Sequence, residues 1–275
     1  MTGINKATLD EISGIVAQTQ KLVAFSGAGI SAESGIPTFR DPGGLWDKLD
    51  VEMFGTLDGL AQAFASRPAF VAEALKGILH SLENAGPNPG HTALAELESM
   101  GFLRTVITQN GDNLHQDAGN RNVIELHGNF YRYACISCGE RHWIGSKKVF
   151  QLGREVIDIM ETADRVDLTM LLAKLPACSC GNLCRPDVVA FGEQVQYLDK
   201  ARQEALDCEV MLVLGTSGVV YPAAMLPDLA KSKGAVVVEV NPNENCFSRI
   251  ADYYIPEKSG SFLPELIKSV RQRYN

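Results

Sequence analysis

The sequence predicts an α/β protein with a doubly wound parallel sheet and a smaller inserted domain. Several apolar runs of strand length end in small or polar residues, and helical segments lie between them. The middle of the chain breaks this pattern, because two cysteine clusters there flank a segment without strand alternation. We expect the sheet domain to comprise residues 1–44, 86–130 and 187–275, and the small domain residues 45–85 and 131–186.

The length and composition of the chain allow one large hydrophobic core and a second, smaller domain. The chain has 275 residues, of which 45% are hydrophobic, and no apolar run is long enough to span a bilayer. The first ten residues lack a charged start followed by a hydrophobic stretch, so we expect a cytoplasmic protein without a membrane partner. The net charge of −8 argues against nonspecific nucleic-acid binding and suits a lysine-bearing partner, although it also simply favours solubility.

A glycine-containing turn follows the first predicted strand. A helix over residues 9–20 precedes the apolar run 22–25, which leads into Gly27-Ala28-Gly29 and then Ala32. This spacing fits the Gly-x-Gly-x-x-Gly/Ala form of dinucleotide-binding, Rossmann-like folds, in which a helix beginning after the second glycine receives the pyrophosphate. A glycine pair also occurs in ordinary tight turns, so the pattern alone leaves both interpretations open.

The remaining elements follow in order along the chain. Helices are predicted at 57–64, 68–82 and 92–100, the last with Gly101 as its C-cap. Further strands are predicted at 103–108, 122–127, 210–214 and 235–240. Together with the first strand they give five junctions between a strand and a polar loop.

Polar residues gather at these junctions. Each has a structural explanation alone: Asn110 and Asp112 as turn formers, His127 as a core histidine, and 215–217 as a helix cap. A doubly wound sheet, however, brings the carboxyl ends of its strands to one edge, where dinucleotides bind. Their joint occurrence therefore predicts a site along that edge.

The cysteine spacing predicts a structural zinc site. Cys135-x-x-Cys138 is half of a zinc-ribbon knuckle, and Cys178-x-Cys180 can supply the other half, although Cys184 is a competing ligand. Four thiolates would stabilise an insert too small for its own core. No acid or base suited to a catalytic zinc lies nearby in sequence, and disulfides are not expected in an intracellular chain.

The stretch 27–40, Gly-Ala-Gly-Ile-Ser-x-x-Ser-Gly-Ile-Pro-x-Phe-Arg, resembles the opening motif of the sirtuins, the NAD-dependent protein lysine deacylases, in a bacterial or archaeal form. Segments 108–115, 125–128, 185–193, 215–217 and 240–242 resemble later sirtuin motifs in the family's order. The resemblance covers nearly the whole chain. It implies a Rossmann-like domain with an inserted zinc-ribbon and helical domain, NAD as co-substrate, one structural zinc ion, and acyl-lysine proteins or peptides as substrates.

The resemblance also implies roles for particular residues. His127 would be the general base, with Asn110 and Asp112 as the other catalytic residues. The residues implied to bind the cofactor are Gly27, Ala28, Gly29, Ala32, Phe39, Arg40, Gln109, Asn110, Gly111, Asp112, Gly215, Thr216, Ser217, Asn241 and Ser259. The residues implied to bind the substrate are Val189, Phe191 and Gly192. By its place before Arg-Pro, Cys180 would complete the zinc ligands Cys135, Cys138 and Cys178.

Some positions depart from the family pattern. Gly111 stands where an aliphatic residue is usual, Asn113 where glycine is frequent, and Ala190 where a bulky residue is common, so the nicotinamide loop or the peptide contacts could differ. Sirtuins that remove acidic acyl groups carry a Tyr-x-x-Arg pair, and here Leu75 and Ile78 lie near those positions, which favours acetyl or longer aliphatic groups.

Two other functions stay open. One is NAD-dependent protein ADP-ribosyl transfer, which would use the same cofactor residues with another nucleophile. The other is a non-catalytic zinc-ribbon and nucleotide-binding module.

Overall fold

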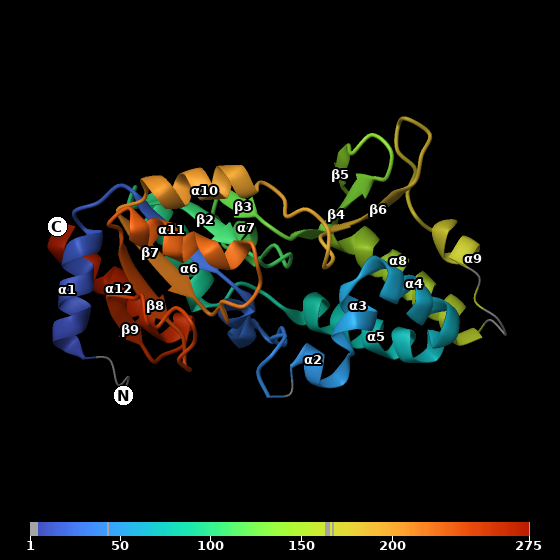
Figure 1. Cartoon of the computed structure of the whole chain (residues 1–275), viewed down its shortest axis with the longest axis horizontal. Coiled ribbons are helices and arrows are strands. Elements are labelled where there is room, and N and C mark those ends of the chain that lie inside the picture. Colours follow the sequence, from blue (N-terminus) through green and yellow to red (C-terminus); the bar gives the residue numbers. More distant parts are fainter. Residues whose placement is uncertain (1–4, 43, 163–165, 167, 275) are drawn as a thin grey trace. The chain divides into compact units, whose positions relative to one another are not determined.

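The structure is a computed structural model that describes residues 5–42, 44–162, 166 and 168–274 (Figure 1). It divides into two compact units. The first comprises Met1–Thr38, Gly86–Leu126 and Val195–Asn275, and the second comprises Phe39–Ala85 and His127–Gln194. Residues 39–44, 127–130 and 187–194, which we had assigned to the sheet domain, belong to the second unit. For 128–130 and 187–188 the reason is that they lie in two strands that pair with each other.

A six-stranded parallel sheet forms the centre of the first unit. Its strands are β1 (Leu22–Ser26), β2 (Leu103–Thr108), β3 (Val123–Glu125), β7 (Val210–Leu214), β8 (Val236–Val240) and β9 (Tyr253–Ile255). Their order is β3-β2-β1-β7-β8-β9, and every pair is parallel. This is the 3-2-1-4-5-6 order of dinucleotide-binding folds, which confirms the predicted fold class.

Helices cover both faces of this sheet. The helices of the first unit are α1 (Lys6–Val16), α6 (Pro89–Ser99), α7 (Leu114–Asp117), α10 (Leu198–Asp207), α11 (Leu226–Ser232) and α12 (Ser259–Tyr274). Successive strand residues point to opposite faces, so Leu22 and Ala24 pack with α1, α6 and α12, whereas Val23 and Phe25 pack with α10 and α11. Each face thus has its own apolar layer.

The segment after β1 differs from our expectation. We predicted a helix beginning after Gly29, and the structure has a seven-residue 3-10 helix, η1 (Ala28–Ser34). It ends at Gly35, whose φ of 85° is left-handed and stops the helix. A second short 3-10 helix, η2 (Ala223–Met225), precedes α11.

The second unit contains a helical part and a small antiparallel sheet. Its helices are α2 (Leu45–Lys48), α3 (Val51–Gly55), α4 (Leu57–Ser66), α5 (Pro68–Asn84), α8 (Gly145–Thr162) and α9 (Leu168–Leu172). Its strands are β4 (Gly128–Cys135), β5 (Arg141–Trp143) and β6 (Cys184–Val188), in the order β5-β4-β6. The helical part packs around Ala63, Val71 and Ala72, and the sheet packs on α8 through Tyr133 and Leu152.

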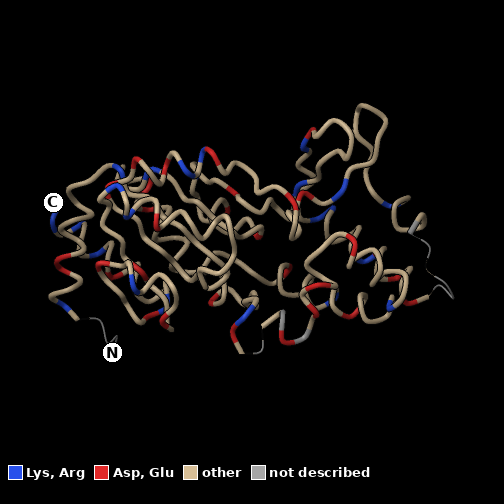
Figure 2. The backbone as a smooth tube through the Cα atoms, viewed as in Figure 1, with Lys and Arg blue, Asp and Glu red and all other residues tan. Residues whose placement is uncertain are grey.

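Charge is distributed over both units. Acidic and basic residues are interspersed along the described backbone of each unit (Figure 2). Within the described residues, no helix is sufficiently long and apolar to cross a membrane.

Candidate functional site

The loops after β1 and β7 touch through their backbones. The Gly29 N–H donates to the Gly215 carbonyl oxygen at 2.8 Å, and the Gly27 N–H donates to the Leu214 carbonyl oxygen at 3.0 Å. A Cβ atom on Gly29 would lie 2.7 Å from the Gly215 carbonyl oxygen, and one on Gly27 would lie 2.8 Å from Thr216 Cβ. Gly215 itself has a φ of 55°. These glycines are therefore required by close approach and backbone conformation.

Ser31 connects the two polar side chains that follow β2. Its hydroxyl donates to Asp112 Oδ2 at 2.7 Å and accepts from Asn110 Nδ2 at 3.1 Å. Asn110 Nδ2 also donates to the Gly27 carbonyl oxygen at 3.1 Å, and Asp112 Oδ1 accepts from the Leu114 N–H at 3.0 Å. Ser31, Asn110 and Asp112 are all buried. The glycine turn and the loop after β2 thus form one hydrogen-bonded group.

Burial raises the pKa of the Asp112 carboxyl above its ordinary value, whereas the hydrogen bonds from Ser31 and Leu114 lower it. The net direction is upward. Two donors, the Ser31 hydroxyl and the Leu114 N–H, thus fix the orientation of this carboxyl group.

Two buried histidines support this network. The rings of His91 and His115 meet edge to face with centroids 4.9 Å apart. His91 Nε2 lies 3.5 Å from Ser31 Oγ, and His115 Nε2 lies 2.9 Å from Ser26 Oγ. Burial lowers the pKa of His91 to about 4 and that of His115 well below its usual range, so both rings are neutral at neutral pH.

Sequence reasoning gave no role to Ser31, His91 or His115. Ser31 and His115 lie within the quoted family segments 27–40 and 108–115, but no function was assigned to either. No local signal marks them, because the partners of these side chains lie 60 to 89 residues away along the chain.

Two of the predicted cofactor residues, Gln109 and Asn241, form hydrogen bonds with Thr216. Gln109 Nε2 donates to Thr216 Oγ1 at 2.9 Å, and Asn241 Nδ2, at the end of β8, donates to the Thr216 carbonyl oxygen at 3.0 Å. Ser259 begins α12, and the following Gly260 N–H donates to Glu33 Oε2 of η1 at 2.9 Å. Strand ends of the first unit thus bring these segments near the glycine turn.

Thirteen predicted cofactor residues belong to the first unit: Gly27, Ala28, Gly29, Ala32, Gln109, Asn110, Gly111, Asp112, Gly215, Thr216, Ser217, Asn241 and Ser259. Phe39, Arg40, His127 and the predicted substrate residues belong to the second. The expectation that His127 lies beside the glycine turn joins residues of different units and stays a prediction.

His127 lies between β3 and β4 and is half-buried. We had predicted a strand that runs into it, but β3 ends two residues earlier, at Glu125. The His127 carbonyl oxygen accepts from the Val189 N–H at 3.0 Å. This bond extends the β4–β6 ladder to the predicted substrate segment, in which Phe191 is 43% exposed and its N–H donates to the Gly55 carbonyl oxygen at 2.7 Å.

The departure at position 113 has a structural account. Asn113 has a φ of 67°, which is the left-handed conformation that glycine adopts easily and asparagine tolerates. Its side chain donates to Asp117 Oδ1 at 2.7 Å. Asn113 therefore supplies the backbone conformation for which glycine is suited.

Four cysteines meet in the second unit. The Sγ atoms of Cys135, Cys138, Cys178 and Cys180 lie within 4.8 Å of one another, whereas Cys184 is outside this group. The Sγ atoms of Cys135 and Cys180 are 3.5 Å apart, and those of Cys138 and Cys178 are 3.6 Å apart. Tetrahedral zinc with Zn–S bonds near 2.3 Å requires sulfur separations of about 3.8 Å, so the cluster is compatible with a structural zinc ion.

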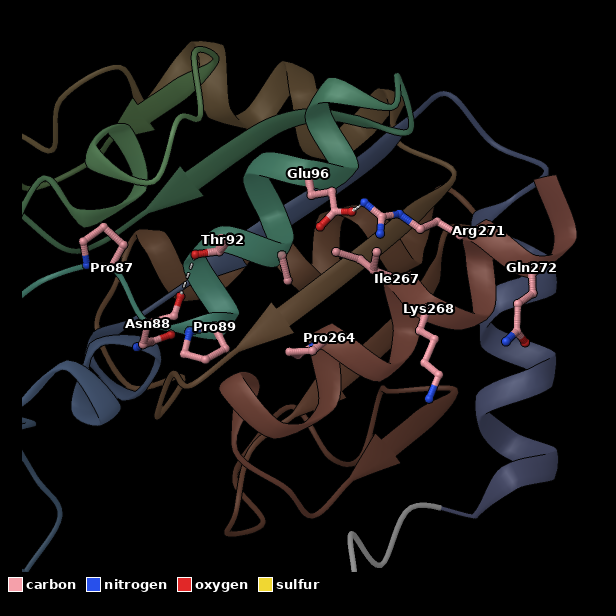
Figure 3. A pocket seen from close by; sticks show the side chains of 11 residues that line it. Pro87, Asn88, Pro89, Thr92, Glu96, Pro264, Ile267, Lys268, Arg271 and Gln272 are labelled. Carbon is pink, nitrogen blue, oxygen red and sulfur yellow. Dashed lines mark hydrogen bonds and ion pairs between the residues drawn. The ribbon is translucent and has the colours of Figure 1, made fainter. Parts of the chain in front are cut away.

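A surface hollow of 620 Å³ lies elsewhere on the first unit, between α6 and α12 (Figure 3). Pro89, Ile267 and Pro264 form much of its wall, and Arg271 pairs with Glu96 across it. None of the predicted site residues lines it. This hollow is therefore separate from the polar network at the strand ends.

Comparisons with known proteins identify the class to which this fold and site belong. Residues 27–222 match the Sir2 family, and the chain belongs to that family. It is 45% identical over 265 residues to a protein of Desulfosudis oleivorans named NAD-dependent protein deacylase, with 96% of each chain covered. It is 44% identical over 267 residues to a protein of the same name from Pyrococcus furiosus, covering 96% of this chain and 98% of that one.

Solved structures agree with the family. A Sir2 homologue bound to NAD is 38% identical, with a TM-score of 0.76, and covers 100% of this chain and 96% of its own. A Sir2 protein in complex with a p53 peptide and NAD+ is 32% identical, with a TM-score of 0.73, over 96% and 98% of the two chains. The family resemblance noted in the sequence is confirmed.

Proposed function

We propose that this chain is an NAD-dependent protein lysine deacylase that acts foremost on acetyl groups. It would transfer the acyl group to ADP-ribose and release nicotinamide. The observation that carries the proposal is the Ser31 network, which holds Asn110 and Asp112 next to a glycine turn at the carboxyl edge of a parallel sheet. The names of full-length relatives support the same reaction.

The residues of the first unit suit a dinucleotide. Gly27, Gly29 and Gly215 form a turn without side chains, and a pyrophosphate would approach its backbone. Asp112 and the Gly111 backbone would bind the nicotinamide amide, and Asn110 and Gln109 the adjoining ribose. Thr216, Ser217, Asn241 and Ser259 would bind the adenosine part. The small side chains of Ala28 and Ala32 would let the nucleotide come close to the backbone of the turn. Arg40 would pair with the phosphates and Phe39 would shield the reacting carbon from water.

NAD supplies a bond between ribose and nicotinamide that breaks readily, since the ring leaves as a neutral molecule. The protein then mainly has to position the acyl-lysine amide and exclude water. His127 would accept a proton from a ribose hydroxyl, which suits an imidazole near neutral pH. Its backbone bond to Val189 fixes the start of the segment in which Val189, Phe191 and Gly192 would line the acyl-lysine channel.

The test is nicotinamide release from NAD in the presence of an acetyl-lysine peptide. Wild type should release nicotinamide only with the acetylated peptide and form O-acetyl-ADP-ribose. His127→Ala should lower kcat by about 10²–10⁴-fold, the usual contribution of a general base. His80→Ala is the matched control, since His80 is exposed on α5, and it should leave the rate unchanged.

The other outcomes identify the alternatives. ADP-ribose attached to protein, with no stimulation by acetylated peptide, would replace the proposal with ADP-ribosyl transfer. Nucleotide binding without nicotinamide release would indicate a binding module.

The acyl preference follows from α5. Leu75 packs against the helical core and Ile78 is half-buried, and neither offers a charge to an acidic acyl group. We therefore expect kcat/KM to be at least about tenfold higher for acetyl-lysine than for succinyl-lysine peptide, a discrimination of about 1.4 kcal/mol. Equal values would contradict this preference.

The remaining assignments complete the proposal. We assign the nucleotide-binding domain to the first unit and the small domain to the second, with zinc in a structural role at the four cysteines. None of the seven cysteines forms a disulfide bond, which suits a reducing cytoplasm. Acylated proteins would be the partners, and neither nucleic acid nor a membrane is required.

A further inference from the structure

A second group of metal-ligating side chains adjoins the four-cysteine cluster. The ligand atoms of His142, Cys178 and Cys184 lie within 4.8 Å of one another. Cys178 thus belongs to both groups. The sequence left Cys184 as a competing zinc ligand, and the structure places it outside the first cluster but beside one of its members.

The strand register explains this placement. In the small sheet, His142 of β5 is opposite Tyr133, and Cys184 of β6 is opposite Cys135. Tyr133 and Cys135 are two residues apart on β4, so their side chains lie on the same face. His142 and Cys184 are therefore presented on that face from the two strands that flank β4.

The imidazole nitrogen at this position has no hydrogen-bond partner among the described residues. His142 Nε2 is buried, and the carboxylate oxygen Glu140 Oε2 lies 3.7 Å from it. The same Glu140 oxygen lies 3.5 Å from Cys178 Sγ. A buried polar atom without a hydrogen bond costs free energy, and a metal ion would satisfy it.

The ligand types suit a thiophilic divalent cation. Thiolate and imidazole are the ligands that zinc prefers, and Glu140 offers a carboxylate oxygen to complete four-coordination. A zinc ion bound by four thiolates keeps an excess of negative charge. A second dication that adds one thiolate and one neutral imidazole reduces this excess, and the Cys184 proton passes to solvent.

We propose that His142, Cys178 and Cys184 form a second metal site for a Zn2+-like cation, which shares the Cys178 thiolate with the four-cysteine site. The simpler explanation of Cys184 is that it is a buried apolar residue, since it is 1% exposed and packs with Tyr133 and Leu152. That explanation leaves His142 Nε2 without a partner, and it predicts one metal ion per chain.

The experiment counts metals on the zinc-loaded, fully reduced chain. Zinc per chain is measured first, and Co2+ is then added without oxygen. Because Co2+ binds such ligands less tightly than Zn2+, it enters only a site that zinc has not filled. We expect either two zinc ions per chain, or one zinc ion and one equivalent of Co2+ with an absorption band for charge transfer from thiolate to cobalt.

Variants distinguish the shared site from adventitious binding. Cys184→Val and His142→Gln should each lower the affinity for the second metal ion at least about tenfold. Both variants should still bind one zinc ion. Cys246→Val, a thiol of the first unit, is the matched control and should bind as wild type does. If Cys184→Val loses all zinc, the substitution has disrupted the four-cysteine site as well. The affinity of His142→Gln for the second metal ion then tests the proposal.

One metal ion in wild type with no cobalt–thiolate band would overturn the proposal. So would a second equivalent that survives His142→Gln unchanged. Neither result depends on deacylase activity, so the outcome is separate from that of the proposed function.

Discussion

The sheet of the first unit and the small sheet of the second are stabilised in different ways. The parallel sheet has an apolar layer on each face, with Phe25, Leu94 and Met211 fully buried. The small sheet shares a short cluster with α8, and three of its five buried members are cysteines. The difference teaches that apolar packing positions the loops at the strand ends of the parallel sheet, whereas we expect the cysteine-rich sheet to depend on zinc coordination.

Removal of the metal should produce the largest difference in stability between the two sheets. Chelation of zinc under reducing conditions should abolish protection from hydrogen exchange in β4, β5 and β6, because structural zinc contributes on the order of 10 kcal/mol in small zinc domains. Protection of β1, β2 and β7 should persist. Exchange measured peptide by peptide with mass spectrometry tests both statements.

Cys135→Ser should reproduce the effect of the chelator, and Cys246→Ser should not. Loss of protection in β1 at the same chelator concentration would contradict the claim that only the small sheet depends on zinc.

A buried carboxylate gives the second contrast. Asp187 in β6 has a side chain that is 4% exposed, and its Oδ2 atom pairs with Arg132 Nε at 2.5 Å and Arg141 Nε at 3.1 Å. Asp187→Asn would remove the charge that compensates two guanidinium groups, so we expect a loss of roughly 3 kcal/mol in the stability of the small sheet. Thermal unfolding and exchange in β4 measure it.

Asp207 in the first unit is the matched control. It also pairs with two cations, Lys21 and Arg104, but its side chain is 50% exposed. Asp207→Asn should change stability little, because exposed pairs are screened by water. Equal losses for the two variants would refute the role that we assign to burial.

A fall in pH should lower the folding stability of the first unit, because His91 is buried in its neutral form. Between its ordinary value of 6.5 and its folded pKa of about 4, the unfolded chain binds a proton that the folded chain does not. Stability is therefore lost as pH falls from about 7 to about 4, by about 2 kcal/mol at pH 5 for this residue. His115 acts in the same direction, and the raised pKa of Asp112 acts in the opposite one.

Urea unfolding at pH 7 and pH 5 measures this effect. In His91→Gln the difference between the two pH values should shrink by about 2 kcal/mol. The exposed His80→Gln in the second unit should retain the full difference. An unchanged pH dependence in His91→Gln would contradict the assignment.

The central strands and the zinc cysteines could be predicted because their signals are local. Residues 22–25, 103–108 and 210–214 are continuous apolar runs, and Cys135-x-x-Cys138 has a characteristic spacing. Family motifs supplied the site residues, whose roles remain to be tested.

Other features depend on distant partners and could not be predicted. The three-residue strand β9 forms only by pairing with β8, and β4 pairs with β6 across some fifty residues of chain. The choice of Cys180 over Cys184 as a zinc ligand was, by contrast, implied by the family resemblance, and the cysteine cluster in the structure agrees with it. The segment η1 likewise forms a backbone hydrogen bond with the loop after β7, almost 190 residues later in the chain.

The backbone contact between Gly29 and Gly215 has a consequence for protein engineering. Because each glycine occupies the space that a side chain on the other would need, neither can be enlarged alone to reshape the loop pair. Under the proposed function, altered preference among nucleotide analogues is better sought by diversifying Gln109 and Asn241, whose side chains donate to Thr216. A library built on those two positions should retain far more folded members than one built on the glycines.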